Sequence, residues 1–247
     1  MSVPKIDLAR SGWVLLALWL GALVLFRAAP GVDLFVTGLF YRADTGFSVI
    51  TNPLWEWLRQ RIWDLAILVF LASLICWPLA LWKGRAVARL SARAWGFVLG
   101  LFFFAPVVIV NGLLKPNSGR ARPANVDLFG GTHHFSIAGD FTDQCTRNCS
   151  FVSGEVSAAV ALSVVIWLGA EAMRDRLPRW GLLYIRATAV FISAFITLQR
   201  VGTGRHFLSD AFFAGMISLS VAWLLWGLIF GDWLARLQAW RARGSRS

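Results

Sequence analysis

The sequence predicts an all-α integral membrane protein with six transmembrane helices and an interfacial helical segment between the first two. Hydrophobic residues make up 57% of the 247 residues and charged residues only 15%, and the mean hydropathy is +0.63. Because soluble domains carry about 25% charged residues, this chain lacks the polar side chains that cover a water-soluble globule. The 14 tryptophans fit aromatic belts at two membrane interfaces.

Composition and charge exclude several classes of protein. Neither a disordered chain nor a water-soluble enzyme fits this hydropathy, and three cysteines cannot form the framework of a disulfide-rich secreted domain. The net charge of +11 is typical of nucleic-acid-binding proteins, but here the basic residues cluster in short segments between apolar runs. Such clusters fix the orientation of a membrane protein, so we expect membrane lipids and no nucleic acid as partners.

Six apolar runs predict the spans, since a helix needs about 20 residues to cross roughly 30 Å of hydrocarbon. The first run is short, but Arg27 can extend to the headgroups at its end. Lys5 and Arg10 are typical of a signal peptide, whereas the sequence around Arg27 is a poor cleavage site, so we predict an uncleaved helix. Residues 1–247 are predicted to form one six-helix domain. The predicted spans are Ser11–Phe26, Leu65–Trp82, Ala94–Leu114, Phe151–Ala170, Gly181–Gln199 and Ala211–Gly231.

The segment Arg27–Asp64, between the first two spans, is predicted to be re-entrant or interfacial. Its stretch from Asp33 to Tyr41 is amphipathic, as in helices that lie in the headgroup layer. Further along, three tryptophans surround two arginines, a composition that also suits the headgroup layer. These residues are Trp55, Trp57, Trp63, Arg59 and Arg61.

Lysines and arginines concentrate on one side of the six predicted spans. By the positive-inside rule this side is cytoplasmic, so both termini are predicted in the cytoplasm and the longer connections in the periplasm of a bacterial inner membrane. The cations on the cytoplasmic side are Lys5, Arg10, Lys83, Arg85, Arg89, Arg93, Arg174, Arg176, Arg179, Arg236, Arg241, Arg243 and Arg246.

The first of three polar clusters on the outer side follows the third span. Lys115, Arg120 and Arg122 lie within eight residues, beside Gly and Pro, and such a group suits an anion with several oxygens. The additional Arg120 suits a highly anionic headgroup. The alternative is a solvated loop anchored to anionic headgroups.

The second cluster, Ser153-Gly154-Glu155, begins the fourth span. A Ser-Gly pair at a helix start offers backbone N–H groups and a hydroxyl to an anion, aided by the helix dipole. The alternative is an N-cap with Glu155 in the first turn, where acidic residues are favourable.

The third cluster precedes the sixth span. His206 and Asp210 are four residues apart, so on a helix they share a face and the carboxylate can orient the imidazole. Gly202 and Gly204 free the preceding loop to bring Arg200 to the same point. A lone His–Asp pair is usually structural, but here it belongs to a third cluster on one membrane face.

Topology brings the three clusters together, and their groups suit phosphoryl transfer, which depends on positioning and charge stabilisation. No dense cluster of carboxylates, histidines or cysteines in the sequence indicates a metal, so no cofactor is expected. The predicted site consists of three cations, two hydrogen-bond donors and a His–Asp pair: Lys115, Arg122, Arg200, Ser153, Gly154, His206 and Asp210.

These clusters resemble the signature of the type 2 phosphatidic acid phosphatase superfamily, which includes bacterial membrane lipid phosphatases and is related to vanadium haloperoxidases. The first family motif is Lys, six residues, Arg-Pro. The third is Ser-Arg, five residues, His, three residues, Asp. The resemblance covers nearly the whole chain, and the residues that match are Lys115, Arg122, Pro123, Arg200, His206 and Asp210.

Three positions depart from the family motifs. Gln199 replaces the Ser of the third motif, and the second motif, Pro-Ser-Gly-His, reads Val152-Ser153-Gly154-Glu155. The resemblance implies that the family's motif-two His protonates the leaving group, and we expect Glu155 to act there as general acid, as carboxylic acids do in glycosidases. The alternative is a Glu that favours the helix dipole or pairs with Arg122.

The resemblance also implies roles for the matching residues. His206 is the nucleophile that forms a phosphohistidine, and Asp210 orients it. The remaining matches hold the phosphoryl group: Lys115, Arg122, Arg200 and the Ser153–Gly154 turn.

The expected function is therefore hydrolysis of a phosphate monoester or pyrophosphate on a lipid, at the periplasmic face. Candidate lipids are lipid A, undecaprenyl pyrophosphate, phosphatidylglycerol phosphate and phosphatidic acid, and the Phe-Val-Ser-Gly-Glu variant favours lipid A. One alternative is a catalytically impaired lipid-phosphate receptor or transporter, which the loss of the motif-two His supports and the intact His206 and Asp210 oppose. Another is phosphoryl transfer between lipids.

The long outer loop Pro123–Ser150 carries two further features. Cys145 and Cys149 lie on the side assigned to an oxidising compartment, where five residues can close a small ring, so we predict a disulfide. His133 and His134 are either headgroup contacts or solvated loop residues.

Overall fold

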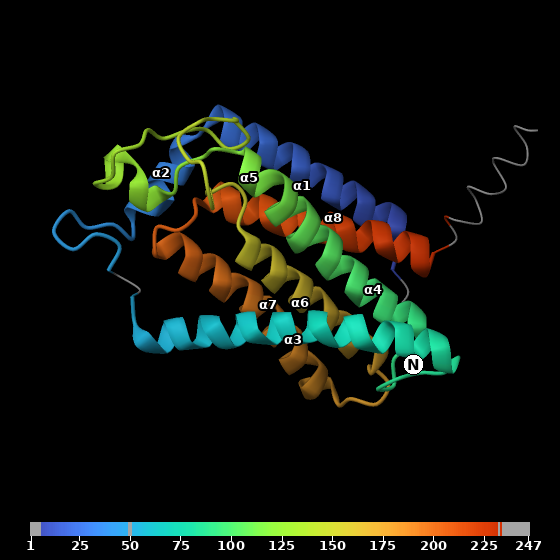
Figure 1. The fold of residues 1–247 in the computed structure, drawn as a ribbon. Helices are drawn as coiled ribbons and strands as arrows, with labels where there is room; N and C mark the ends of the chain where they lie inside the picture. Colours follow the sequence, from blue (N-terminus) through green and yellow to red (C-terminus); the bar gives the residue numbers. More distant parts are fainter. Residues whose placement is uncertain (1–5, 49–50, 232, 234–247) are drawn as a thin grey trace, which may run out of the picture.

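The computed structural model describes residues 6–48, 51–231 and 233, which form a bundle of helices (Figure 1). Among these residues, six helices are long and apolar enough to cross a membrane, which confirms the predicted fold class. Lys5 and the tail residues Arg236, Arg241, Arg243 and Arg246, used in the orientation prediction, lie outside the described residues. The six spans are α1 (Leu8–Ala28), α3 (Pro53–Lys83), the continuous helix Ala92–Asn117, α6 (Gly154–Ala172), α7 (Arg179–Gly202) and α8 (Leu208–Ile229).

The second span, α3, begins at Pro53 and not at Leu65, so the second half of the predicted interfacial segment is wrong. Asn52 caps the helix by accepting a 2.8 Å hydrogen bond from the backbone N–H two residues later, and proline is favourable at the first helical position. The charges that suggested an interface are paired one turn apart along the helix, as Arg59 is with Glu56.

The first half of that segment contains a short helix, α2 (Gly31–Gly38). Its polar side chains point inward and not toward the headgroups, since Asp33 is 1% exposed while Phe35 is 70% exposed. The predicted amphipathic pattern is therefore present, but the polar face points inward. The reason is a buried arginine of the site region, with which Asp33 pairs.

The third span changes its helical type midway. It consists of α4 (Ala92–Phe102), the π-helix η1 (Phe103–Leu114) and a last turn, α5 (Lys115–Asn117). Pro106 lies inside η1, where its missing N–H and its ring disturb an α-helix. The side chain of Asn111 donates a 2.7 Å hydrogen bond to the Pro106 carbonyl and so satisfies a backbone group within the membrane.

The helix α6 lies at the centre of the bundle and packs against α3, η1, α7 and α8. Its buried face is rich in alanine and serine, small residues that let membrane helices approach closely. Ser157 shares a 2.8 Å hydrogen bond with Ser218 of α8, and Ser163 a 2.7 Å bond with Ser193 of α7. This packing fixes the ends of α6 and α7 relative to each other, which the site requires.

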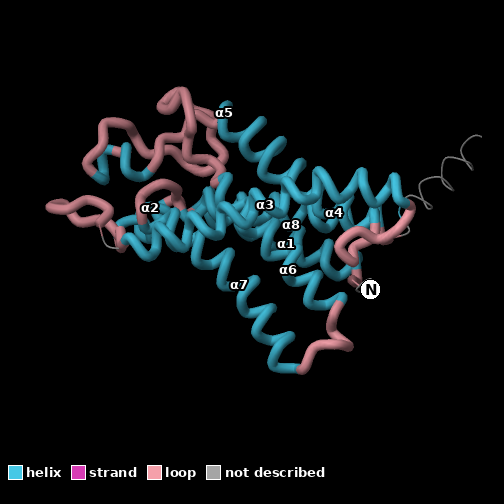
Figure 2. Tube along the Cα trace, turned by 60° about the horizontal axis from the view of Figure 1, so that its bottom comes forward, coloured by secondary structure: helices cyan, strands magenta, loops and turns pink. Residues whose placement is uncertain are grey.

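The loops gather at the two ends of the bundle (Figures 1 and 2). One end holds α2, the start of α3, the long α5–α6 loop with its short 3-10 helices η2 (Pro123–Asn125) and η3 (Asp127–Phe129), and the α7–α8 turn. The other end holds the α3–α4 and α6–α7 connections. The three predicted clusters therefore lie at the same end.

Candidate active site

Most of the predicted site residues surround one cavity of about 440 Å³ at the loop-rich end of the bundle. The start of α5, the end of α7 and the starts of α3 and α6 contribute to it. Five of the predicted residues line the cavity, namely Lys115, Arg122, Glu155, Arg200 and His206. Ser153, Gly154 and Asp210 are buried and are not among its lining residues.

The two arginines of the basic loop after α5 lie in different environments. Arg122 lines the cavity, whereas Arg120 is buried inside the protein. Gly119 has a φ of +62°, and a Cβ there would lie 1.4 Å from a backbone carbonyl oxygen, so this turn requires glycine. Arg120 then points into the protein and is fully buried, with Nη1 2.6 Å from Asp210 Oδ1 and Nη2 2.9 Å from Asp33 Oδ2. The prediction that Arg120 serves an anionic headgroup is wrong, because two buried carboxylates neutralise it.

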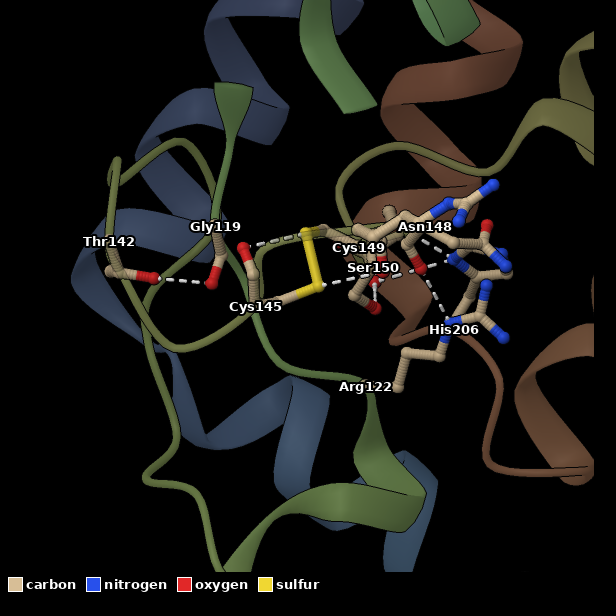
Figure 3. The surroundings of a disulfide bond; sticks show 10 residues. Gly119, Arg122, Thr142, Cys145, Asn148, Cys149, Ser150 and His206 are labelled. Carbon is tan, nitrogen blue, oxygen red and sulfur yellow. Dashed lines mark hydrogen bonds and ion pairs between the residues drawn. A yellow bond between two sulfur atoms is a disulfide. The ribbon is translucent and has the colours of Figure 1, made fainter. Parts of the chain in front are cut away.

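The predicted disulfide is confirmed and lies beside the site (Figure 3). Cys145 and Cys149 are bonded, and the carbonyl of Asn148 within this ring accepts a 3.0 Å hydrogen bond from Nε of Arg122. Burial lowers the pKa of Arg122 below its ordinary value, and the charge of Arg205 adds to this shift. The ring therefore holds a partly desolvated guanidinium at the cavity wall.

His206 is buried, with 4% of its surface exposed, and its Nδ1 lies 2.7 Å from the backbone carbonyl of Ser150 (Figure 3). A carbonyl only accepts hydrogen bonds, so Nδ1 carries the proton and Nε2 keeps a free lone pair. Burial lowers the pKa of His206, and the charge of Asp210 opposes the shift only in part. The imidazole is therefore neutral near pH 7, as a nucleophile requires.

Asp210 forms no direct hydrogen bond with His206. Asp210 Oδ2 lies 3.8 Å from His206 Nδ1, beyond hydrogen-bond range. It accepts instead from the Ser150 hydroxyl at 2.5 Å and the Phe207 N–H at 2.8 Å. Since α8 begins only at Leu208, the two residues do not share a helical face. Ser150 links the two groups, because its hydroxyl contacts Asp210 and its backbone carbonyl contacts the imidazole.

Glu155 is held by two arginines from different helices. Its Oε2 accepts a 2.9 Å bond from Nη1 of Arg59 on α3, and its Oε1 a 3.0 Å bond from Nη1 of Arg200 on α7. The predicted alternative, an ion pair with Arg122, is therefore wrong, because Glu155 pairs with Arg59 and Arg200 instead. The Glu155 carboxyl group is thus shared by two guanidinium groups and offsets part of their positive charge.

The orientation of Arg200 has a different cause from the predicted one. Arg200 lies within the last turn of α7, so the helix and not a flexible loop directs it to the cavity. The turn that follows reverses the chain, with Gly204 at a φ of +66°. In this turn the N–H groups of Arg205 and His206 both donate to the Arg200 carbonyl.

Ser153 is an N-cap, as in the alternative interpretation of its cluster. Its Oγ accepts from the Val156 N–H at 3.4 Å, and its own N–H donates to the Asp210 carbonyl. The hydroxyl is fully buried and serves the helix end. Its contact with a phosphate therefore remains a prediction, as does that of Gly154.

Several residues of the cavity escaped sequence reasoning. Arg59 is 96 residues from its partner Glu155, and no local pattern signals such a contact. The same holds for Glu56, Asn148 and Arg205, which also line the cavity. His133 and His134 are not among its lining residues, and His134 pairs with Asp127 in the exposed loop.

The cavity is electrostatically positive. Among its described lining residues are five cations and two carboxylates: Arg59, Lys115, Arg122, Arg200, Arg205, Glu56 and Glu155. An excess of positive charge in a partly desolvated site stabilises a bound phosphate and the charge that develops during its transfer. The arrangement can thus hold a phosphoryl group beside the lone pair of His206.

Comparison with known proteins agrees with this chemistry. The family model described as the PAP2 superfamily matches residues 93–233. The chain belongs to the PAP2 superfamily. A lipid A 4'-phosphatase of Rhizobium leguminosarum is 31% identical over 83% of this chain and 90% of its own, and one of Rhizobium etli is 30% identical over 82% and 81%.

A solved structure was also found, that of a transmembrane PAP2 type phosphatidylglycerolphosphate phosphatase from Bacillus subtilis. It covers 87% of this chain and 94% of its own, with 20% identity and a TM-score of 0.47.

Membership in the PAP2 superfamily confirms the resemblance drawn from the motifs. It also confirms the predicted enzyme class, a phosphatase that acts on lipid phosphates. With six apolar helices in the described part of the chain, this PAP2 protein is a multi-pass bacterial membrane protein.

Proposed function

We propose that this PAP2 protein hydrolyses a phosphate monoester of lipid A at the periplasmic face of the inner membrane, with His206 as nucleophile. The observation that carries the proposal is the bond between His206 Nδ1 and the Ser150 carbonyl, which leaves Nε2 free in a cavity lined by cations. The relatives named lipid A 4'-phosphatases support the choice of lipid among the four candidates and favour the 4'-phosphate.

The first step is attack of His206 Nε2 on phosphorus. A nitrogen–phosphorus bond forms while the bond from phosphorus to the lipid oxygen breaks, and Nδ1 keeps its proton on the Ser150 carbonyl. Lys115, Arg122 and Arg200 stabilise the charge on the phosphoryl oxygens. Water then attacks phosphorus, the nitrogen–phosphorus bond breaks, and inorganic phosphate leaves.

Departure of the lipid oxygen requires a proton, for which Glu155 is the proposed donor. In the resting site its two oxygens are bound by Arg59 and Arg200. A phosphate bound by Arg200 competes with Glu155 for that guanidinium and adds negative charge beside it. Both changes favour uptake of a proton from solvent by the carboxylate, and this proton then passes to the leaving oxygen. In the second step the attacking water gives a proton to Glu155, which releases it to solvent when phosphate leaves and Arg200 returns to the carboxylate.

Two features support the proposed orientation. The α3–α4 and α6–α7 connections carry clustered lysines and arginines, as cytoplasmic segments do. The opposite end, with the cavity, carries the Cys145–Cys149 disulfide, which suits an oxidising compartment. The active site is thus proposed to be periplasmic and both termini cytoplasmic.

The test is incubation of the purified protein with lipid A and the other candidate lipids, with and without EDTA. We expect loss of one phosphate from lipid A, at the 4' position, with release of inorganic phosphate and no effect of the chelator. A phosphorylated acceptor lipid without free phosphate would indicate transfer between lipids. Binding without turnover would indicate a receptor or transporter.

A further inference from the structure

Five side chains at the edge of the cavity form a closed ring of hydrogen bonds and ion pairs. Arg59 donates through Nε to both carboxylate oxygens of Glu56 at 2.9 Å and through Nη1 to Glu155 at 2.9 Å. Arg200 bonds to the other oxygen of Glu155 at 3.0 Å. Gln199 closes the ring, since its Oε1 accepts from Arg200 Nε at 2.6 Å and its Nε2 donates to Glu56 at 3.1 Å.

The ring joins three helices that are remote in sequence. Glu56 and Arg59 belong to α3, Glu155 to α6, and Gln199 and Arg200 to α7. Two guanidinium groups face two carboxylates, so the ring is neutral as a whole. Arg59 and Arg200 are largely buried, at 14% and 11% side-chain exposure, so the loss of one member leaves a charge without its partner in a poorly solvated place.

Two of the three departures of this chain from the family motifs, Glu155 and Gln199, are members of the ring. Each contacts a residue of α3, which contains no family motif: Glu155 contacts Arg59, and Gln199 contacts Glu56. A serine at position 199 is too short for its hydroxyl to bond both Glu56 and the Arg200 guanidinium as the glutamine amide does. The two departures are thus parts of one structural unit.

The two arginines bind different oxygens of Glu155, and this has a consequence during the reaction. When Arg200 turns to a bound phosphate, the Arg59 contact to Oε2 can persist, because Glu56 holds the Arg59 guanidinium through a separate pair of bonds. Arg59 then fixes one oxygen of Glu155 and leaves the other, Oε1, to carry the proton.

We propose that Arg59, held by Glu56, is the positioning residue for Glu155, and that it keeps this side chain at the cavity wall while Arg200 binds the phosphate. This inference rests on the proposed function, since it assigns Glu155 to the leaving group. Arg59 acts through Glu155 and not on the phosphate itself. Its removal therefore impairs the same step as removal of Glu155.

The experiment is a double-mutant cycle of Arg59→Ala and Glu155→Gln, assayed on a lipid with an alkyl phosphate and on an aryl phosphate with a good leaving group. We expect Arg59→Ala to lower kcat on the alkyl substrate by about tenfold or more and on the aryl substrate by less than about threefold. In the Glu155→Gln background the same change should have an effect of less than about twofold. Arg59→Lys keeps the positive charge but lacks the planar guanidinium that bonds two carboxylates at once. It should therefore retain only part of the wild-type kcat on the alkyl substrate.

Arg61→Ala is the matched control, because Arg61 lies on the same helix, is 55% exposed and pairs with Asp64. Full additivity of the two changes, or equal losses on both substrates, would assign Arg59 to phosphate binding or to the fold and overturn the proposal. If Arg59→Ala does not fold in detergent, Arg59→Gln completes the cycle. An inactive wild type, or an active His206→Ala variant, would instead disprove the proposed function.

Discussion

The Nδ1 atom of His206 lies 2.7 Å from the carbonyl oxygen of Ser150, and the hydroxyl of the same serine lies 2.5 Å from Asp210. One buried serine therefore fixes the imidazole through its backbone and the carboxylate through its side chain. Because a carbonyl cannot donate, this contact selects the tautomer with a free lone pair on Nε2.

The first prediction concerns this nitrogen. His206→Ala should lower phosphate release by a factor on the order of 10³ or more, because no other group supplies the attack. The unfolding temperature should change little, since the Asp210 contacts to Ser150 and Phe207 remain. A quench at alkaline pH followed by mass spectrometry should find a phosphohistidine at residue 206 in the wild type. Turnover by the alanine variant near the wild-type rate would exclude this mechanism.

The second prediction is the acid limb of the pH profile. Burial lowers the pKa of His206 below its ordinary value of 6.5, and only the neutral imidazole can attack. The midpoint of the acid limb of kcat/KM should therefore lie below pH 6.5. Asp210→Asn removes a negative charge that raises this pKa, so its acid limb should lie at still lower pH, with a lower plateau. An acid-limb midpoint above pH 6.5 would contradict the assignment.

The third prediction concerns the buried chain Asp33–Arg120–Asp210. Asp33 also accepts hydrogen bonds from the backbone N–H and hydroxyl of Ser209, so it ties α2 to the start of α8. Asp33→Ala leaves the fully buried Arg120 with one carboxylate and should lower the free energy of unfolding by about 3–5 kcal/mol. Chemical unfolding in detergent measures this change. Asp44→Ala, at an exposed position of the same region, should have no comparable effect.

Asp33 and Arg120 also show where sequence reasoning ends. Hydropathy predicts the six spans because each span is a local property of about 20 residues. The motif spacing likewise predicts Lys115, Arg122, Arg200 and His206, since topology alone brings span ends together. No local pattern distinguishes the buried Arg120 from its neighbour Arg122, which lines the cavity. That difference depends on the turn at Gly119 and on a carboxylate 87 residues away.

The ends of the spans were less predictable than their existence. The charged residues in the first turns of α3 favour an interfacial segment when the sequence is considered alone. In the structure Glu56 and Arg59 pair with each other and with residues of α6 and α7. The same contacts account for the unforeseen role of Arg59. A charged residue in a span can be interpreted only once its partner is known, and here the partner is on another helix.

The fourth prediction concerns the disulfide. The Cys145–Cys149 ring contains Asn148, whose carbonyl holds Arg122, and Ser150 follows it directly. Replacement of both cysteines by serine should lower kcat/KM by about tenfold, because misplaced binding groups lose orientation, while the fold persists. Dithiothreitol should have the same effect on the wild type. Cys76→Ser, whose free thiol lies in α3, is the control and should respond to the reductant as the wild type does. Full activity of the double variant would show that the ring is not needed for the site.

The fifth prediction separates the two interpretations of Glu155. A general acid matters most when the leaving group is poor, so Glu155→Gln should reduce hydrolysis of an alkyl lipid phosphate by about 10²-fold or more and that of an aryl phosphate far less. Glu155→His should restore part of the rate on the alkyl substrate, because an imidazolium donates a proton as well. The ion pairs with Arg59 and Arg200 supply the competing explanation, in which Glu155 only offsets part of the charge of two guanidinium groups. In that case glutamine, which has no charge but nearly the same shape, would disturb binding and slow both substrates equally. The histidine variant, which adds no negative charge, would then give no recovery.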